Sequence, residues 1–156
     1  MGVTGCGKTT VGAQLAQECA WEFLDADDFH PQANVAKMQR GVALTDTDRW
    51  PWLERLNQLL RERECAGRSL VLACSALKQV YRERLAQDCK TLRYVLLEGD
   101  QALIRALLAA RRGHYMNPAL LDSQFAILER PEDALVLDVA EDPVALARRI
   151  RAALAV

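Results

Sequence analysis

The chain has 156 residues, of which 51% are hydrophobic and 26% charged, and its formal net charge is −1. This length suits a single domain over residues 1–156 with one buried core. The balanced charge gives no long-range attraction to nucleic acid or anionic lipid, and no apolar run approaches the roughly 20 residues that span a bilayer. Five cysteines without a C-x-x-C pair are expected to be reduced thiols. We therefore expect a cytoplasmic protein with no nucleic-acid or membrane partner.

The first nine residues carry the pattern G-x-x-x-x-G-K-T, from Gly2 to Thr9. Glycines let a loop turn its N–H groups toward an anion, the lysine reaches the β- and γ-phosphates, and the threonine hydroxyl can hold Mg²⁺. Helical spacing follows at once, so the loop would open a helix whose N-terminus favours phosphate. The alternative is a glycine-rich turn that matches by chance. The residues predicted to bind ATP here are Gly2, Val3, Thr4, Gly5, Cys6, Gly7, Lys8, Thr9 and Thr10.

A short apolar run, Trp21–Leu24, leads into carboxylates at Asp25 and Asp27. Ligands of open α/β sheets gather at the carboxyl ends of the strands, and this spacing predicts two carboxylates on the same side of a strand. In phosphoryl transfer one carboxylate, here Asp25, can hold Mg²⁺ while Asp27 orients the acceptor hydroxyl and takes its proton. The alternative is an acidic turn that caps the strand.

Helices and strands alternate along the rest of the chain. The predicted elements are a helix over 31–40, a loop over 43–53 leading into a helix with Pro51 in its first turn, a fully buried strand over 69–74, a helix carrying Tyr81, a strand over 94–97, helices over 100–110 and 119–128, a strand over 135–138 and a closing helix from Pro143. This alternation predicts an α/β fold with a parallel sheet and helices on both faces.

A phosphate-binding loop normally follows a buried strand, and only Met1 precedes this one. We count four strands after the loop, and the missing first strand would make five. We therefore expect an upstream, in-frame extension with an apolar, β-rich run of about five to eight residues.

Several basic residues are candidates for binding anions. Arg49 lies in the predicted loop between two helices and has the planar fork that matches a carboxylate, although a surface ion pair with Asp46 or Asp48 is the alternative. Arg111 and Arg112 lie in an interrupted segment that we interpret as a flap closing over ATP, where positive charge assists phosphoryl transfer. The alternative is a basic helix C-terminus that complements the helix dipole. Neither histidine has a second ligand at metal spacing.

Taken together, these motifs resemble the gluconate kinases, small P-loop kinases related in fold to shikimate and adenylate kinases. The matching segments run almost from end to end. They are Gly2–Thr9, Asp25-Ala26-Asp27, His30-Pro31, Asn34, Lys37-Met38, Leu44, Asp46, Asp48-Arg49, Pro51-Trp52-Leu53, Cys74–Lys78, Tyr81-Arg82, Gly113–Met116, Ser123-Gln124-Phe125 and Leu128-Glu129.

The resemblance implies transfer of the γ-phosphate of ATP to the 6-hydroxyl of D-gluconate, with Mg²⁺ as cofactor. It implies a three-layer P-loop fold with a parallel sheet in the order 2-3-1-4-5, a short lid around Arg111, and a homodimer. Asp27 would face the substrate hydroxyl and Arg49 the carboxylate. Further candidates around the polyol are His30, Lys37, Lys78 and Gln124, with Lys8, Asp27 and Arg111 as the catalytic residues.

One position departs from this family, whose members usually carry arginine where this chain has Leu107, one turn before Arg111. Two other functions therefore remain open. One is a kinase of another small acid or polyol, such as shikimate, because an arginine reads a carboxylate and not a carbon skeleton. The other is a catalytically impaired nucleotide-binding protein.

Overall fold

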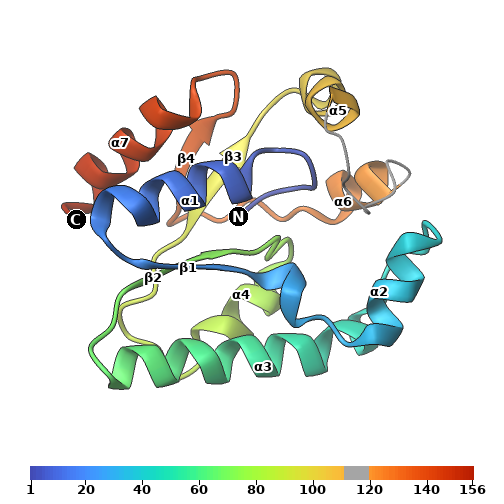
Figure 1. The fold of residues 1–156 in the computed structure, drawn as a ribbon. Coiled ribbons are helices and arrows are strands. Elements are labelled where there is room, and N and C mark those ends of the chain that lie inside the picture. Colours follow the sequence, from blue (N-terminus) through green and yellow to red (C-terminus); the bar gives the residue numbers. More distant parts are fainter. Residues whose placement is uncertain (111–119) are drawn as a thin grey trace.

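The computed structural model describes residues 1–110 and 120–156 of the chain, in which helices and strands alternate (Figure 1). The elements are α1 (Lys8–Cys19), β1 (Glu22–Asp25), the 3₁₀ helix η1 (Ala26–Phe29), α2 (Gln32–Gln39), α3 (Asp46–Cys65), β2 (Leu70–Ala73), α4 (Gln79–Ala86), β3 (Val95–Glu98), α5 (Gln101–Ala110), α6 (Leu120–Ile127), β4 (Leu135–Asp138) and α7 (Pro143–Leu154). The predicted α/β class is confirmed.

The described strands form two separate parallel pairs, β1 with β2 and β3 with β4. Asp25 lies opposite Ala73 in the first pair, and Glu98 lies opposite Asp138 in the second. Parallel neighbours require crossover connections, which the helices between the strands provide. The predicted order 2-3-1-4-5 counts the strand expected before the phosphate loop as strand 1, so β1 and β2 correspond to strands 2 and 3, and β3 and β4 to strands 4 and 5. The two observed pairs agree with the neighbours 2-3 and 4-5 of that order. The central strand of that order stays a prediction.

Helices cover both faces of the strands and make three layers. In Figure 1, α1 and α7 lie on one side of the strands, and α3 and α4 lie on the other. Each side has its own apolar cluster, because each helix pair buries its apolar stripe against the strands. The cluster under α1 and α7 includes Val11, Leu15, Leu97, Leu137, Leu146 and Ile150, and the cluster above α3 and α4 includes Trp52, Leu53, Leu56, Cys74, Tyr81 and Leu85.

The start of α3 differs from the prediction. The helix begins at Asp46, so Arg49 lies inside it and not in a loop. Thr45 and Asp48 form a reciprocal capping box, in which the Thr45 hydroxyl accepts from the Asp48 N–H and the Asp48 carboxylate accepts from the Thr45 N–H. Pro51 lies inside the helix, where it omits one backbone hydrogen bond. The prediction was wrong because it took Pro51 as a first-turn residue and overlooked the cap.

Strand β2 also differs from the prediction of a fully buried strand. Leu70, Val71 and Leu72 are only partly buried, and Ala73 alone is buried. These residues line a cavity on the side of β2 that faces β3. Among the described residues β2 has only β1 as a strand neighbour, so its other side borders the cavity and the strand is not fully buried.

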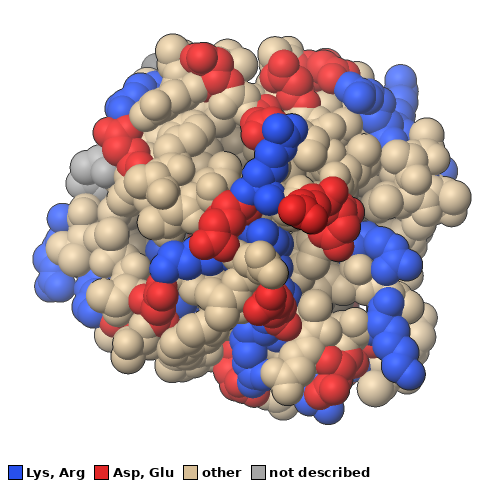
Figure 2. All heavy atoms as spheres, turned by 180° about the vertical axis from the view of Figure 1, so that it is seen from behind, with Lys and Arg blue, Asp and Glu red and all other residues tan. Residues whose placement is uncertain are grey.

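Acidic and basic side chains are interspersed on the face shown in Figure 2, which is the back of the view in Figure 1. Oppositely charged side chains also form ion pairs between elements, as Arg63 on α3 does with Glu22 on β1 across 2.7 Å. This face therefore presents no continuous basic surface of the kind that binds a nucleic-acid backbone. Within residues 1–110 and 120–156, no helix is long and apolar enough to cross a membrane.

Candidate active site

The glycine-rich loop ends where α1 begins. Gly7 directly precedes the helix with a φ of 93°, a left-handed conformation that side chains disfavour. No side chain of the described residues caps this helix N-terminus, so its first N–H groups stay available to an anion. The Lys8 ammonium donates to the Val3 carbonyl over 2.9 Å and thereby lies over the loop. A glycine cradle, uncapped N–H groups and an ammonium together fit a nucleotide phosphate.

Asp25 connects the end of β1 to the first turn of α1. One of its carboxylate oxygens accepts from the Thr9 hydroxyl at 2.8 Å, and the other accepts from the Asp27 N–H at 3.1 Å. A hydroxyl and a carboxylate side by side are the oxygen ligands that Mg²⁺ prefers. Asp27 itself lies in η1, so the expectation that both carboxylates leave one face of a strand was wrong. Asp25 caps a 3₁₀ turn at this point, and the turn carries Asp27 into the cleft.

His30 packs behind Asp27. Its Nε2 lies 4.0 Å from Asp27 Oδ1, and its ring stacks on Trp52 with centroids 4.2 Å apart. The imidazole side chain is only 3% exposed. Burial, together with the nearby charge of Arg49, lowers the pKa of His30 to about 4. The ring is therefore neutral at physiological pH, and it adds no positive charge beside Asp27.

Arg49 reaches the cleft from the first turns of α3. The residue is 8% exposed, and its Nε has no hydrogen-bond partner among the described residues. Its guanidinium carbon lies 5.5 Å from the centroid of the Tyr81 ring. A buried donor without an acceptor costs about 1–3 kcal/mol, so the site favours a ligand that supplies one. A carboxylate is such a ligand, and the guanidinium fork suits it.

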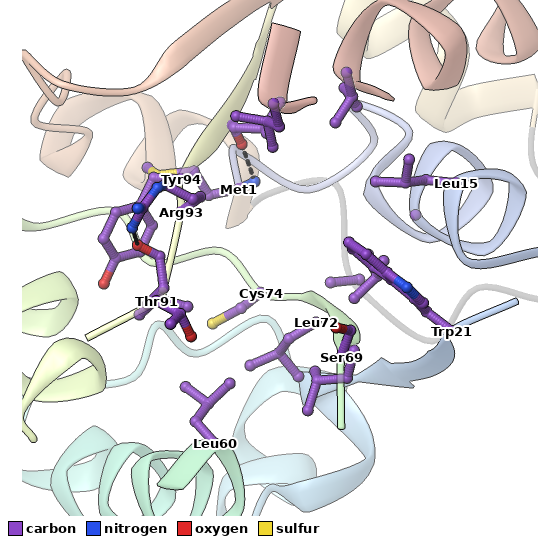
Figure 3. A pocket seen from close by; sticks show the side chains of 18 of the residues that line it. Met1, Leu15, Trp21, Leu60, Ser69, Leu72, Cys74, Thr91, Arg93 and Tyr94 are labelled. Carbon is purple, nitrogen blue, oxygen red and sulfur yellow. Dashed lines mark hydrogen bonds between the residues drawn. The ribbon is translucent and has the colours of Figure 1, made fainter. Parts of the chain in front are cut away.

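These groups face one cleft. Its lining residues are Thr4, Gly5, Gly7, Lys8, Thr9, Asp25, Asp27, His30, Met38, Ala43, Leu44, Arg49, Ser75, Leu120, Ser123 and Gln124. The cleft encloses only about 50 Å³, well below the roughly 300–1,000 Å³ typical of small-molecule sites. The described residues therefore outline part of a substrate site. A larger cavity of about 610 Å³ (Figure 3), lined by residues of β2 and β3, shares Lys8 with this cleft, but its lining is mostly apolar and lacks Asp25, Asp27 and Arg49.

Lys37 and Lys78 do not line this cleft. The Lys37 ammonium lies 2.6 Å from Asp48, and its hydrogen bond contributes most to lowering the pKa of that carboxyl to about 2. The Lys78 ammonium lies 2.8 Å from Asp46, which also accepts from the Tyr81 hydroxyl. Asp46 and Asp48, in the first turn of α3, are the residues considered above as surface partners of Arg49. In the structure they pair with Lys78 and Lys37 instead. A substrate role for either lysine stays a prediction.

The other predicted residues are distributed around the loop. Gly2, Val3 and Cys6 are buried within it, while Thr10 is exposed on α1. Gln124 on α6 accepts from the Thr4 N–H at 2.6 Å and so joins α6 to the phosphate loop. Arg111, with the rest of the predicted flap, lies outside the described residues.

Comparison with known proteins identifies this arrangement. The sequence model of a family described as an AAA domain matches residues 1–131. Gluconokinase of Gluconobacter oxydans is 47% identical over 133 residues, which cover 85% of this chain and 75% of that protein. A probable gluconokinase of Rattus norvegicus is 45% identical over 149 residues, covering 84% and 80%. The chain belongs to the gluconokinase family.

Solved structures agree with this membership. The crystal structure of a gluconokinase from Sinorhizobium meliloti is 37% identical, with a TM-score of 0.89 over 99% of this chain and 89% of that one. A sugar kinase from a Janibacter species is 42% identical, with a TM-score of 0.92 over 97% and 90%. The Mycobacterium tuberculosis APS kinase, at 16% identity and a TM-score of 0.75, shares the fold alone.

Six lining residues of the cleft were not predicted as site residues. They are Met38, Ala43, Leu44, Ser75, Leu120 and Ser123. Ser75 had a usable signal, because it follows the carboxyl end of the β2 run, where ligands of α/β sheets gather. The apolar residues had none, since Met38, Leu44 and Leu120 form a small buried cluster that no local pattern distinguishes from core.

Proposed function

We propose that this member of the gluconokinase family transfers the γ-phosphoryl group of ATP to the 6-hydroxyl of D-gluconate, giving 6-phospho-D-gluconate and ADP. The observation that carries this proposal is one cleft lined by the phosphate loop, the Thr9–Asp25 pair, Asp27 and Arg49. Gluconokinases from bacteria and plants are 40–47% identical to the chain over most of its length.

Asp27 is the proposed general base. The 6-hydroxyl oxygen attacks the γ-phosphorus, the bond from that phosphorus to the β,γ-bridging oxygen breaks, and the hydroxyl proton passes to the Asp27 carboxylate. The neutral ring of His30 stands behind this carboxylate and adds no charge that would weaken it as a base. The negative charge that moves to ADP is met by the loop N–H groups and by Lys8.

Arg49 is the residue proposed to bind the substrate carboxylate. Its buried Nε has no partner among residues 1–110 and 120–156, which supports this role, since a substrate carboxylate could accept from Nε as part of a bidentate pair. Residues proposed to contact the polyol are His30 and Gln124, which line the cleft, and Lys37 and Lys78, which do not line it and pair with Asp48 and Asp46.

The loop residues Gly2–Thr10 are the proposed ATP site, with Arg111 as an additional catalytic cation. Thr9 and Asp25 would hold Mg²⁺, because their oxygens are adjacent and the carboxylate brings negative charge. The ion would supply charge neutralisation at the transferring phosphate. A cytoplasmic homodimer is the form we propose for the protein.

A coupled assay that records ADP release with MgATP tests the function. Turnover with gluconate and none with shikimate is expected. Turnover with shikimate and none with gluconate would mean that Arg49 binds the carboxylate of a different small acid, because an arginine recognises the carboxylate and not the rest of the substrate. Tight ATP binding with no acceptor-dependent ADP release would instead support a nucleotide-binding protein without catalysis, a possibility motivated by Leu107.

A further inference from the structure

His30 is held beside Asp27 by the backbone of η1 and by Trp52. The His30 N–H donates to the Asp27 carbonyl at 3.4 Å, where η1 ends. The Trp52 indole N–H donates to the Ala26 carbonyl at 2.7 Å, and the indole ring stacks on His30 with an interplanar angle of 13°. Trp52 is fully buried, so water does not compete for either contact. One side chain therefore fixes both the turn that carries Asp27 and the imidazole next to it.

Asn34, in the first turn of α2, contacts the other nitrogen of this imidazole. The residue is 4% exposed, and its amide nitrogen lies 2.7 Å from the Asp48 carbonyl oxygen and 3.4 Å from His30 Nδ1. A carbonyl oxygen can only accept a hydrogen bond, so the amide NH₂ group faces both atoms and the amide oxygen does not. Asn34 therefore offers one hydrogen to Asp48 and one to His30 Nδ1.

Asp48 holds Asn34 in this orientation. Its carboxylate accepts from the Lys37 ammonium at 2.6 Å and from the Thr45 N–H at 2.9 Å, as part of the capping box of α3. The contact between Asn34 and the Asp48 carbonyl thus ties α2 to the anchored start of α3. Turning the amide of Asn34 over would place its oxygen against the Asp48 carbonyl oxygen and lose a buried hydrogen bond.

These contacts select one tautomer of His30. Burial, together with the nearby charge of Arg49, lowers the pKa of His30 to about 4, so the ring is neutral and carries a single N–H. Because Nδ1 accepts from Asn34, the proton is on Nε2. Nε2 is the nitrogen that lies 4.0 Å from Asp27 Oδ1. The N–H of the imidazole is therefore on the side of Asp27.

We propose that Asn34 is a positioning residue for phosphoryl transfer, which acts through the Nε2–H tautomer of His30 on the carboxylate of Asp27. The inference rests on the proposed function, in which Asp27 is the general base. The separation of 4.0 Å is longer than a hydrogen bond of about 2.7–3.2 Å, and we expect it to shorten when the substrate binds. The His30 N–H then holds Asp27 Oδ1, and Oδ2 receives the proton of the substrate hydroxyl.

The exposure of the two side chains favours this role for His30 over direct contact with the polyol. The imidazole is 3% exposed, whereas the side chain of Asp27 is 35% exposed. A substrate in the cleft therefore meets much more of Asp27 than of His30. The two roles differ in kinetics, since a positioning residue affects turnover and a residue that contacts the polyol affects the Michaelis constant for gluconate.

The first test measures the tautomer and needs no catalysis. Nitrogen NMR of the protein with isotope-labelled histidine distinguishes a protonated from an unprotonated ring nitrogen, and a His30→Gln variant identifies the His30 signals. At neutral pH we expect the proton on Nε2. Asn34→Asp can only accept, so it should protonate Nδ1, whereas Gln39→Glu, at an exposed position of the same helix, should leave the His30 signals unchanged. A proton on Nδ1 in the wild type, or an unprotonated Nδ1 in Asn34→Asp, would overturn the proposal.

The second test separates the N–H of His30 from its stacking on Trp52. His30→Phe keeps an aromatic ring and has no N–H, while His30→Gln has an amide N–H and no ring. We expect His30→Phe and Asn34→Asp to lower kcat by about tenfold or more, and His30→Gln by no more than about threefold. The Michaelis constant for gluconate should change by less than about twofold in all three. Packing alone predicts the opposite order of the two His30 variants, and that order would refute the inference. So would a raised Michaelis constant for gluconate with unchanged kcat.

A double variant tests whether His30 acts through Asp27. In an Asp27→Asn protein, adding His30→Phe should lower the remaining kcat by less than about twofold, because the carboxylate that His30 positions is already gone. A further tenfold loss would show that His30 acts independently of Asp27 and would contradict the proposal. If the wild type released no ADP with gluconate, the proposed function would fail, and the tautomers of the wild type and of Asn34→Asp would decide the positioning contact by themselves.

Discussion

The Thr9 hydroxyl lies 2.8 Å from a carboxylate oxygen of Asp25. Thr9 belongs to the first turn of α1 and Asp25 to the end of β1, so the packing of helix on strand brings together two oxygens 16 positions apart in the sequence. The contact is the strongest local indication of where Mg²⁺ would be held, because both atoms are ligands of the hard-cation type.

Asp25→Asn should therefore raise the Mg²⁺ concentration for half-maximal activity by about tenfold or more, because it removes the negative charge from the site. The amide oxygen can still accept from the Asp27 N–H, so the turn at η1 should survive and Tm should change little. Titrating activity with Mg²⁺ measures the effect. Asp28→Asn, at the exposed neighbour on η1, is the matched control, and an equal response of the two variants would contradict the assignment.

Asp27→Asn should lower turnover by roughly two or more powers of ten and leave ATP affinity nearly unchanged. The substitution preserves shape and removes the proton acceptor. Steady-state turnover with gluconate and a separate ATP-binding titration make the distinction. Near-normal turnover in this variant would remove Asp27 from the mechanism.

Arg49→Ala should weaken gluconate binding by about 2–5 kcal/mol and affect ATP binding far less, because a charge-assisted pair with the substrate carboxylate is lost. The Michaelis constant for gluconate measures this, with Tm recorded because Arg49 also packs over Tyr81. Arg55→Ala removes an exposed arginine from the same helix and serves as the control. An unchanged Michaelis constant for gluconate would refute the role.

Folding stability should decrease as the pH falls from about 6.5 to 4. His30 has a folded-state pKa of about 4, whereas an unfolded histidine titrates near 6.5. Between these values the unfolded chain binds more protons, so acid favours unfolding, by up to about 3 kcal/mol. Above pH 6.5 both states are neutral and the contribution is complete. Denaturant unfolding of wild type and His30→Gln across this range isolates the contribution of the histidine. If the free energy of unfolding depended on pH in the same way in both proteins, the prediction would be wrong.

Leu107→Arg should raise turnover or ATP affinity several-fold by adding positive charge one turn before Arg111. Leu107 is 37% exposed on α5, so the substitution removes no core side chain. Ala106→Arg adds the same charge at the adjacent exposed position and is the control. No gain from Leu107→Arg, or an equal gain from both variants, would mean that this arginine position is not required.

Local sequence patterns determined much of the framework. The phosphate loop and the helix after it could be predicted because glycine spacing and helical periodicity are properties of neighbouring residues. The strand over Leu135–Asp138 and the helix from Pro143 were confirmed for the same reason. The start of α3 was missed although its signal is local, since Thr45 and Asp48 have the spacing of a capping box.

The tertiary structure alone decided the surroundings of the charged residues. Sequence left Arg49 between a substrate ligand and a surface ion pair, because burial and partners depend on segments far apart in the chain. Packing of α3 buries Arg49, and the described part of the chain offers no acceptor to its Nε. Asp46 pairs instead with Lys78, which directly precedes α4. The sequence likewise predicted parallel strands, but only the structure shows that β1 pairs with β2 and β3 with β4. Which strands become neighbours is decided by the packing of whole elements, and no local pattern contains that information.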